Sequence, residues 1–524
     1  MPPEKKYDLK KIIIVGVLLL VIMGLLGYWF FVIRKPAFND PSQTKNLFPF
    51  GDNQTTTSLT DQGNTPGIVT PPLGENPIKV TEGDRLRMVA NYPVTGYYSF
   101  IENRLTPQPK FDEKTKETIV STLNVPVNIL RFNVKEKGFL IDAEINTDSI
   151  IVSQKTKTEF PVPEELWFTR AGSGFVFRTW NDYENTIDSF VASLPEIKPL
   201  GYCEKTLTGI VAQGSKNETV KELQKYLAKK LAVVITADGS FGAKTTTLVK
   251  QLQNLFALPQ TGKLDDLTRE AINGDCLNIQ TDYANKNKGP FVLTGAFLPS
   301  NILRGTSSPD GTSLFFLKKN NSGSVIGTLA SANGTNQKPF FESPFSEWNP
   351  VWINENLITM TTLASREANG YLYGLNPKTG DFKKILGPIR GLTTNTNPDG
   401  TKVLYTTSTD KGIITRVYTI ANGNLQTLEM PTLAEKCVWK DNVIIICAIP
   451  QTTPSAQYPD AWYQGLLSFS DSIWSINTDS GVTNLILAPL KAFDMIKPGL
   501  SPDKNYFFFI NKKDSTLWSY RLND

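Results

Sequence analysis

Three short stretches in the second half of the chain place the same kind of turn before an apolar run. They read SPDGTSLFFL from Ser308, NPDGTKVLYT from Asn397 and SPDKNYFFFI from Ser501, and weaker versions begin at Asn349 and Cys437. Successive starts lie about 40 to 65 residues apart, and several are followed by hairpin-like segments such as IWSINTDSGVTNLIL. Repeats of this length are typical of β-propeller blades. The pattern therefore predicts a mainly β fold with about six to eight blades.

The two ends of the β-type sequence indicate how such a ring closes. The last repeat offers only three strand-like runs before Asp524, whereas β-type sequence also begins much earlier, at about Lys79. A strand from this early part that completes the last blade leaves no sheet edge exposed. Two stacked β-sandwiches are the alternative fold, since a single sequence does not show that a ring closes.

An uncharged apolar segment, IIIVGVLLLVIMGLLGYWFFVI, runs between Lys11 and Arg34. At about 1.5 Å per residue it is long enough to cross a hydrocarbon core of roughly 30 Å, so residues 12–33 are predicted to form a transmembrane helix. A cleaved signal peptide is the alternative, but the run is too long for one and aromatic residues follow it. Lysines before the run place the N-terminus in the cytoplasm and most of the chain outside the cell membrane, which the chain crosses once.

Composition excludes several classes of function. The 524 residues contain no histidine, which is the usual general base, the partner of nucleophilic Ser and Cys, and the commonest zinc ligand. The formal net charge of +4 is spread along the chain without a basic block, so we expect no nucleic-acid partner. We also expect no metal and no cofactor.

The four cysteines fall into two local pairs. Cys203 and Cys276 bracket a segment with helical patterns, and Cys437 and Cys447 stand symmetrically about Asn442 in CVWKDNVIIIC. A hairpin that turns at this asparagine brings the second pair opposite each other across two strands. Outside the cytoplasm both pairs are predicted to be disulfides. Four reduced, buried thiols are the alternative.

The segment between the first two cysteines nearly repeats a turn and the start of a helix. ADGSFGAKT, which ends at Thr245, is followed by QTGKLDDLT, which ends at Thr268. Each glycine-containing turn reverses the backbone into the next helix, and Phe241 and Leu264 are the apolar residues of the two turns. A first helix is expected to begin just after Asn217 as its N-cap. The segment is therefore predicted to be a compact three-helix unit.

Over residues 215–273 this unit resembles the peptidoglycan-binding domain that accompanies many bacterial wall enzymes and envelope proteins. The resemblance is carried by Val220, Leu223, Gln224, Leu227, Asp238, Gly239, Phe241, Gly242, Thr245, Leu252, Gln253, Leu258, Gly262, Thr268, Ala271 and Ile272. Ala257 departs from it, because the family usually has a glycine there. The resemblance implies binding of the wall polymer in a groove beside the turns and the second helix.

The candidate contact residues are taken from this motif. The polar candidates are Gln224, Asp238, Thr245, Gln251 and Gln253, and the turn residues Gly239, Phe241, Gly242, Gly262 and Thr268 complete the set. A structural role is the alternative for each residue, since short motifs of this kind mostly encode backbone shape. A second candidate surface is the aromatic cluster of Tyr458, Trp462 and Tyr463, for which a packing anchor is the alternative to a binding loop.

Two catalytic patterns are present in outline. Ser501 and Lys504 fit S-x-x-K, and residues 378–380 fit K-T-G. Catalytic versions require a helix after the serine, whereas strand-like runs follow here, which favours simple turns. The separation of paired carboxylates for glycan cleavage is three-dimensional and is not shown by a sequence. We therefore predict a protein that is not an enzyme.

These observations predict an envelope protein in six parts. They are a cytoplasmic tail (1–11), a transmembrane helix (12–33), a flexible tether (34–78), a first propeller part (79–200), a peptidoglycan-binding-like domain (201–280) inserted between two blades, and a second propeller part (288–524). The expected partners are peptidoglycan, the membrane, and a protein that binds the propeller. The alternatives are a peptidoglycan hydrolase that uses carboxylates, and an envelope scaffold or sensor whose helical domain binds nothing.

Overall fold

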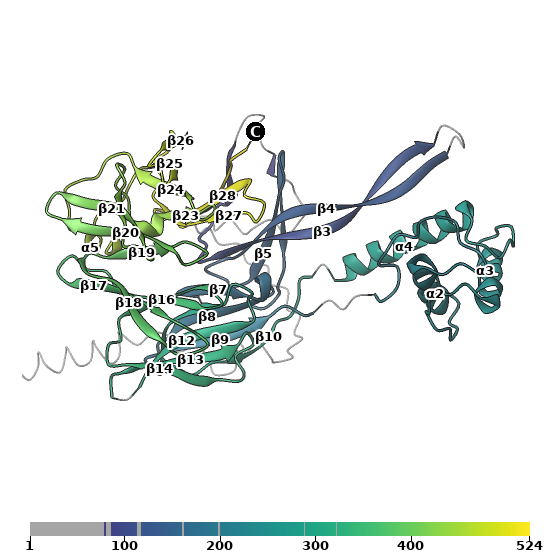
Figure 1. Ribbon diagram of the computed structural model, residues 1–524, viewed down its shortest axis with the longest axis horizontal. Coiled ribbons are helices and arrows are strands. Elements are labelled where there is room, and N and C mark those ends of the chain that lie inside the picture. The colour runs from purple at the N-terminus through teal and green to yellow at the C-terminus, as the bar shows by residue number, and fades with distance from the viewer. Residues whose placement is uncertain are drawn as a thin grey trace, which may run out of the picture. The chain divides into compact units, whose positions relative to one another are not determined.

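The computed structural model describes residues 78–79, 85–112, 117–159, 162–196, 200–287, 289–320 and 322–523 (Figure 1). The predicted cytoplasmic tail (1–11), transmembrane helix (12–33) and all but the last residue of the tether (34–78) lie outside these ranges. Within the described ranges, no helix combines the length and the apolar character needed to cross a bilayer. The membrane anchor therefore stays a prediction from the sequence.

The strands in the described residues form seven sheets, each a meander of antiparallel strands that makes one propeller blade (Figure 1). Blade 1 contains β3 (Tyr97–Asp112), β4 (Glu117–Asn133), β5 (Leu140–Ile145), β6 (Ser149–Gln154) and, at its edge, β1 (Ile78–Lys79). Blade 2 contains β7 (Glu165–Thr169), β8 (Gly174–Asn181), β9 (Thr186–Ser193) and β10 (Thr294–Phe297). Blade 3 contains β11 (Ile302–Ser307), β12 (Ser313–Lys319), β13 (Val325–Ser331) and β14 (Lys338–Ser343).

The remaining blades follow the same plan. Blade 4 contains β15 (Trp348–Asn354), β16 (Leu357–Thr362), β17 (Asn369–Leu375) and β18 (Phe382–Arg390). Blade 5 contains β19 (Thr393–Thr396), β20 (Lys402–Thr409), β21 (Gly412–Thr419) and β22 (Leu425–Thr427). Blade 6 contains β23 (Cys437–Trp439), β24 (Ile444–Pro450), β25 (Asp471–Asn477) and β26 (Thr483–Leu487). Blade 7 contains β27 (Met495–Leu500), β28 (Tyr506–Asn511), β29 (Leu517–Arg521) and β2 (Leu86–Ala90).

The ring closes because its last blade borrows a strand from the start of the propeller. β2 pairs with β29, so that Leu86 lies opposite Tyr520 and Met88 opposite Trp518. This pairing covers the edge that three C-terminal strands alone would leave open. The predicted propeller and its closure by an N-terminal strand are both confirmed, and the alternative of two stacked sandwiches is wrong.

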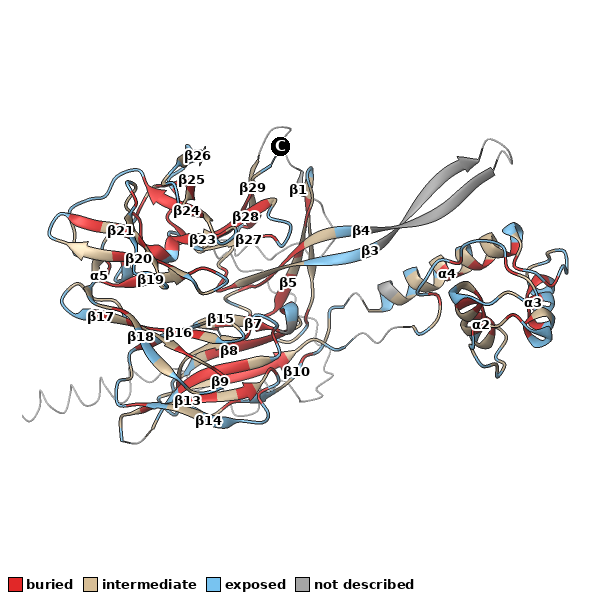
Figure 2. Cartoon of the chain, viewed as in Figure 1, coloured by how far each residue is buried: buried red, intermediate tan, exposed pale blue. Residues whose placement is uncertain are grey.

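The second strand of a blade is buried on both of its faces (Figure 2). In β28, Phe508 packs in one cluster with Phe132 of blade 1, whereas Phe507 packs in another with Ile446 of blade 6. A strand between two neighbouring blades has no solvent-facing side, so its sequence is an apolar run without alternation. This packing explains the YFFFI run that marks the repeat in the sequence.

The recurring PDG-type turns join the first and second strands of blades 3, 5 and 7. In each turn the aspartate accepts a hydrogen bond from the backbone N–H two residues later, at 3.0 Å for Asp310, 2.9 Å for Asp399 and 3.1 Å for Asp503. The residue after each aspartate has a positive φ of 60° to 78°. That conformation suits glycine, and Lys504 is the residue that adopts it without being glycine. The turns are therefore backbone devices.

The helical segment interrupts a blade. Helices α2 (Glu218–Lys230), α3 (Ala243–Leu255) and α4 (Asp266–Lys286) lie between β9 and β10, which pair with each other in blade 2. The prediction that this domain is inserted between two blades is therefore wrong. The strand β10 has only four residues, and a Cβ at its Gly295 would lie 2.2 Å from the carbonyl oxygen of Val191. A strand this short, with glycine required by close approach, has little sequence signal.

Candidate functional site

The helical domain has a small apolar core that matches the sequence pattern. α2 begins after Asn217, whose side chain accepts a hydrogen bond from the Val220 N–H at 3.0 Å, as expected of the predicted N-cap. Phe241 and Leu264, one from each repeated turn, are fully buried in this core. α4 extends beyond the predicted third helix and ends at Lys286.

Gln224 of α2 holds the first repeated turn from inside the domain. Its amide nitrogen donates to Asp238 Oδ1 and to the Ser240 carbonyl, both at 2.9 Å, and more weakly to the Thr245 hydroxyl at 3.4 Å. Its amide oxygen accepts the N–H of Gly239 at 2.9 Å. Because the side chain is 2% exposed, its hydrogen bonds tie the turn to the helix core.

Gln253 of α3 does the same for the second turn. Its amide nitrogen donates to the hydroxyls of Thr261 and Thr268 and to the carbonyl of Lys263, at 2.8 to 2.9 Å. Its oxygen accepts the N–H of Gly262 at 2.9 Å, and the side chain is 0% exposed. The repeat in the sequence is thus a repeated hydrogen-bonding unit, in which a buried glutamine satisfies the backbone and hydroxyl groups of a glycine turn.

The candidate contact residues divide into an internal and an exposed group. The internal group is buried and contains Gln224, Gly239, Phe241, Thr245, Gln253, Gly262 and Thr268. The exposed group contains Asp238, Gly242 and Gln251. The N–H of Ser240, and then the Gln224 amide, lower the pKa of Asp238, so its carboxylate is held ionised at the surface. Ligand contact by any of these residues stays a prediction, and the exposed group is the one that solvent reaches.

The disulfide between Cys203 and Cys276 ties the segment that enters the domain to α4, as predicted. Asn273 strengthens the same junction, because its side chain exchanges two hydrogen bonds with the backbone of Leu207 at 3.0 and 3.1 Å. A cavity of about 20 Å³ beside the disulfide is large enough for about one water molecule. This end of the domain is a closure and offers no space for a sugar.

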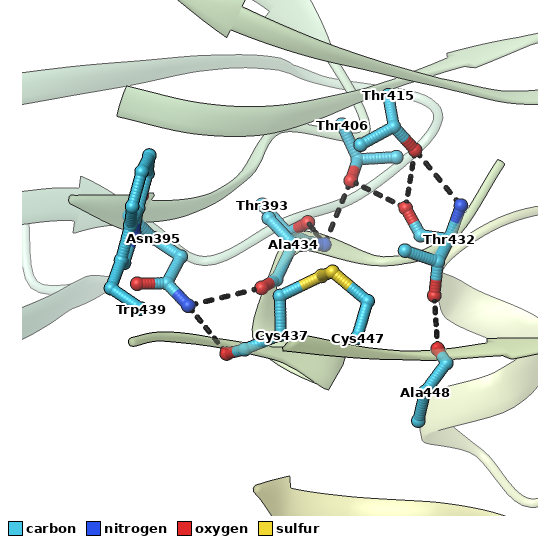
Figure 3. The surroundings of a disulfide bond; sticks show 10 residues. All are labelled: Thr393, Asn395, Thr406, Thr415, Thr432, Ala434, Cys437, Trp439, Cys447 and Ala448. Carbon is cyan, nitrogen blue, oxygen red and sulfur yellow. Dashed lines mark hydrogen bonds between the residues drawn. A yellow bond between two sulfur atoms is a disulfide. The ribbon is translucent and has the colours of Figure 1, made fainter. Parts of the chain in front are cut away.

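The second predicted disulfide lies in the propeller, where Cys437 of β23 faces Cys447 of β24. Figure 3 shows the buried hydroxyl network around it. Thr432 donates to the Ala448 carbonyl at 2.7 Å, and the Thr415 hydroxyl donates to the Thr432 carbonyl at 2.7 Å. The network joins blades 5 and 6, so both cysteine pairs serve the architecture.

The centre of the propeller contains two adjoining cavities of about 740 and 440 Å³. Arg304, Asn349 and Glu435 line both of them, so the two spaces are continuous. Arg304 lies in β11 and Asn349 in β15, the first strands of their blades, and Glu435 lies just before β23. β11 and β15 contact each other, and the turn that contains Glu435 (Ala434–Lys436) contacts the first strands β19 and β27. The cavities therefore belong to the central channel of the propeller.

The channel carries charges of both signs, some paired and some not. Arg178 and Glu165 form an ion pair in which the glutamate side chain is partly exposed. Arg304 donates to the carbonyl of Leu303 at 3.0 Å and forms no ion pair with any residue that the structure describes. Lys497 donates to the Thr95 carbonyl at 2.8 Å. It is exposed to the channel, but the protein around it reduces its hydration and lowers the pKa of its ammonium group.

On another side of the channel, Glu435 lies near Lys436 and Lys512, whose charges act to lower its pKa. Its carboxylate accepts a hydrogen bond from the Tyr463 hydroxyl at 2.7 Å and forms no ion pair among the described residues. Solvent in the channel reaches this side chain, but protein surrounds it, and the resulting loss of hydration raises the pKa of Glu435. Arg304 and Glu435 are thus unpaired groups of opposite charge that line the same space.

The aromatic cluster in the insertion between β24 and β25 is mainly a packing anchor. Tyr458 and Trp462 are buried and stack on Phe469, with ring centroids 5.9 and 6.0 Å apart. The indole N–H of Trp462 donates to Asp494 at 2.9 Å. Tyr463 is the member of the cluster that stays half exposed, and it reaches the channel.

A buried charge cluster holds this insertion in place. The Lys436 ammonium group lies 2.8 Å from Asp471 and 2.7 Å from Asp494, and all three side chains are 0% exposed. The same ammonium group lies 5.0 Å from the ring of Trp462. A buried cation with two carboxylates, each hydrogen-bonded further, is a tightly coupled unit that fixes the position of the loop.

The two catalytic patterns are turns in the structure. Ser501 is 2% exposed, and its hydroxyl accepts the N–H groups of Asn505 and Tyr506 at 3.1 and 2.9 Å at the start of β28. Lys378 forms an exposed ion pair with Glu355 at 3.0 Å in the turn between β17 and β18. A strand follows each pattern, so neither has the helix that a serine–lysine mechanism requires.

Comparison with known families identifies the type of the helical domain. Residues 216–272 match the family model described as "Putative peptidoglycan binding domain". The helical insertion is a domain of the peptidoglycan-binding type. The match covers α2, α3 and the first turns of α4, which are the parts that the two glutamines hold together. The search of curated proteins gave no match to the chain.

Solved structures that match the chain do so at low sequence identity. TolB from Acinetobacter baumannii is 13% identical, with a TM-score of 0.29 over 42% of this chain and 54% of TolB, so the chain matches about half of that protein. An oligogalacturonate lyase from Vibrio parahaemolyticus is 8% identical, with a TM-score of 0.39 over 81% of this chain and 99% of the lyase. The propeller domain of the Trilobed protease from Pyrococcus furiosus is 8% identical, with a TM-score of 0.37 over 82% and 96%. The assignment of seven blades is therefore based on the strand pairing in the described residues and not on these matches.

Sequence reasoning missed the channel residues. Arg304 and Glu435 stand in no motif, and Trp180 is one of nine tryptophans. The channel collects single residues from blades that are far apart in the chain, so no local spacing marks them.

Proposed function

We propose that this protein is a non-catalytic component of the bacterial cell envelope that binds peptidoglycan through its helical insertion. The family match over residues 216–272 carries the proposal. It is supported by a complete domain, in which three helices, two glutamine-held turns and a disulfide are all in place.

Membrane attachment and location outside the cytoplasm are part of the proposal. The apolar segment at residues 12–33 is long enough to span a bilayer and supports a single-pass anchor. The two disulfides support an oxidising compartment, because cytoplasmic thiols are kept reduced. The tether at residues 34–78 would then give the folded part reach toward the wall.

The propeller is proposed to present a surface to a protein partner. Trp180 and Tyr463 support this role, because they line the channel and are 47% and 45% exposed. Exposed aromatic side chains of this kind are enriched at the centres of protein interfaces. The peptidoglycan-binding domain would then hold the propeller, and whatever it binds, at the wall.

Cosedimentation with insoluble peptidoglycan tests the proposal and separates it from the hydrolase alternative. The full-length protein is expected to sediment with purified sacculi and to leave the supernatant free of muropeptides. Soluble fragments released over time would show a hydrolase and would contradict the non-catalytic proposal. A protein that stays in the supernatant would support the scaffold or sensor alternative, in which the helical domain binds nothing.

A further inference from the structure

The central channel has the volume of a small-molecule site. Its larger cavity, of about 740 Å³, lies within the roughly 300 to 1,000 Å³ that is usual for ligand pockets. It continues into the second cavity through Arg304, Asn349 and Glu435. Neither cavity includes residues of the helical insertion, so this site does not depend on peptidoglycan binding.

The charges that line the channel are only partly neutralised by one another. Glu165 neutralises Arg178, and Glu164, which also lines the larger cavity, forms no ion pair with Arg304. The Arg304 guanidinium therefore has no bonded carboxylate among the residues that the structure describes. Lys497 adds a second cation, whose hydrogen bond goes to a backbone carbonyl. Two cations without bonded carboxylates, one of them a guanidinium, favour a ligand carboxylate, which a guanidinium binds through two parallel hydrogen bonds.

The opposite charge lies in the same space. Glu435 has the Tyr463 hydroxyl as its donor and no ammonium or guanidinium group bonded to it within the described ranges. A purely anionic ligand that contacts Arg304 would also meet this carboxylate, whereas a purely cationic ligand would meet Arg304 and Lys497. Like charges at short range inside a channel cost free energy. A ligand with both a carboxylate and an amine satisfies both groups at once.

The rim of the channel adds apolar contacts. Trp180 and Ile187 line the larger cavity, at the two ends of the hairpin that joins β8 and β9. The Trp180 side chain is 47% exposed, so its ring is available to cover an apolar side chain. Asn349 lines both cavities and offers a neutral amide for a peptide bond.

We propose that the propeller channel binds a short peptide with a free carboxylate and a free amine, the carboxylate at Arg304 and the amine at Glu435. Lys497 supports the carboxylate end, and Tyr463 orients the Glu435 carboxylate. This inference goes beyond the proposed function, because it assigns the channel a short peptide as ligand, distinct from the wall polymer at the helical domain and from the protein partner of the propeller.

Titration of the full-length protein with matched synthetic dipeptides tests the proposal. The panel contains dipeptides with apolar, basic and acidic side chains, each made with free ends, with an amidated C-terminus and with an acetylated N-terminus. Isothermal titration is expected to show binding of free-ended members, and a loss of about tenfold or more for each blocked end, since each block removes a charge-assisted hydrogen bond.

Two variants assign the ends to their residues. Arg304→Gln is expected to remove the difference between acid and amide while the amine remains recognised, and Glu435→Gln is expected to remove the difference between amine and N-acetyl. Arg390→Gln and Glu429→Gln are the controls, because both side chains are exposed and neither lines the cavities. These controls are expected to bind like the unaltered protein.

The proposal is overturned if no free-ended dipeptide binds below about 10 mM, a level that corresponds to less than 3 kcal/mol. It is also overturned if Arg304→Gln weakens acid and amide equally. Unchanged thermal unfolding of the variants shows that a loss of binding is not a loss of folding. Sedimentation with sacculi is read separately, and its failure leaves this proposal standing.

Discussion

The helical insertion and the propeller channel use their polar side chains in opposite ways. In the insertion, the amides of Gln224 and Gln253 are bonded to their own turns and are buried. In the channel, Arg304 and Glu435 form no ion pair within the described residues and face open space. The motif that stands out in the sequence therefore encodes folding, whereas the groups free to meet a ligand stand in no motif.

The same contrast occurs between two neighbours in the chain. Lys436 is buried between Asp471 and Asp494, whereas Glu435, the residue before it, lies in the channel. Lys436 is fully paired and stabilises the fold, whereas Glu435 is available to a ligand. Substitutions at these positions and at the glutamines test whether the bonded groups stabilise the fold more than the unpaired groups do.

The largest expected effect is at the paired charge. Lys436→Met leaves two buried carboxylates without their cation and is expected to lower the free energy of unfolding by about 3–5 kcal/mol. Lys378→Met, at an exposed ion pair in the same propeller, is expected to change it by about 0.5 kcal/mol or less. Urea denaturation followed by tryptophan fluorescence measures both. Equal losses of stability in the two variants would contradict the expectation that the buried ion pairs matter more than the exposed one.

The next effect is at the glutamine of the second turn. Gln253→Ala leaves the Gly262 N–H and two hydroxyls without their partner and is expected to destabilise the helical domain by about 3 kcal/mol. Gln251→Ala, two residues earlier and exposed, is expected to cost less than about 0.5 kcal/mol. Hydrogen exchange of residues 216–272 in the full-length protein measures both variants. Unchanged protection in the first variant would contradict the structural role of Gln253.

A smaller effect of opposite sign is expected where the turn chemistry departs from the family. Ala257, which follows α3, has a φ of +54°, a region that favours glycine. Ala257→Gly is therefore expected to stabilise the domain by about 0.5–1 kcal/mol, because relief of strain exceeds the added chain entropy. Ala228→Gly, inside α2, is expected to destabilise it by about 1 kcal/mol. Hydrogen exchange of the helical domain measures both changes in stability, which are expected to have opposite signs.

The smallest expected effect is a pH dependence in the channel. Loss of hydration in the channel raises the pKa of Glu435, so the folded protein holds this proton more tightly than the unfolded chain does. The contribution to stability is therefore complete at low pH and is lost as pH rises through the raised pKa. Glu435→Gln is expected to remove the share of this loss of stability that comes from Glu435. The free energy of unfolding is measured against pH for the unaltered protein and for Glu435→Gln. The same pH dependence in both proteins across the acidic range would contradict a raised pKa.

Local signals in the sequence predicted much of the fold. The turn-and-strand repeat, the N-cap at Asn217 and both cysteine pairs depend on residues close in the chain, and all three are confirmed. The place of the insertion was predicted wrongly, because β10 has four residues and its partner β9 precedes the helices. A strand pair interrupted by a domain has no short-range signal.

The candidate site was less accessible to sequence reasoning for a related reason. A buried glutamine and an exposed one look alike in a sequence, and α3 contains both, at Gln253 and Gln251. Only the backbone places one against Gly262 and leaves the other in solvent. The residues that line the larger cavity come from blades 2, 3, 4, 6 and 7, and closure of the ring brings them together.

The most direct test of the account is sedimentation with sacculi by a variant in which a Gly-Ser linker replaces residues 200–287. This exchange keeps Leu293, which is buried in the core of blade 2, so the propeller is expected to fold. The account predicts that this variant stays in the supernatant while Arg304→Gln in the full chain sediments like the unaltered protein. Sedimentation of the variant without its helical domain would contradict peptidoglycan binding by that domain.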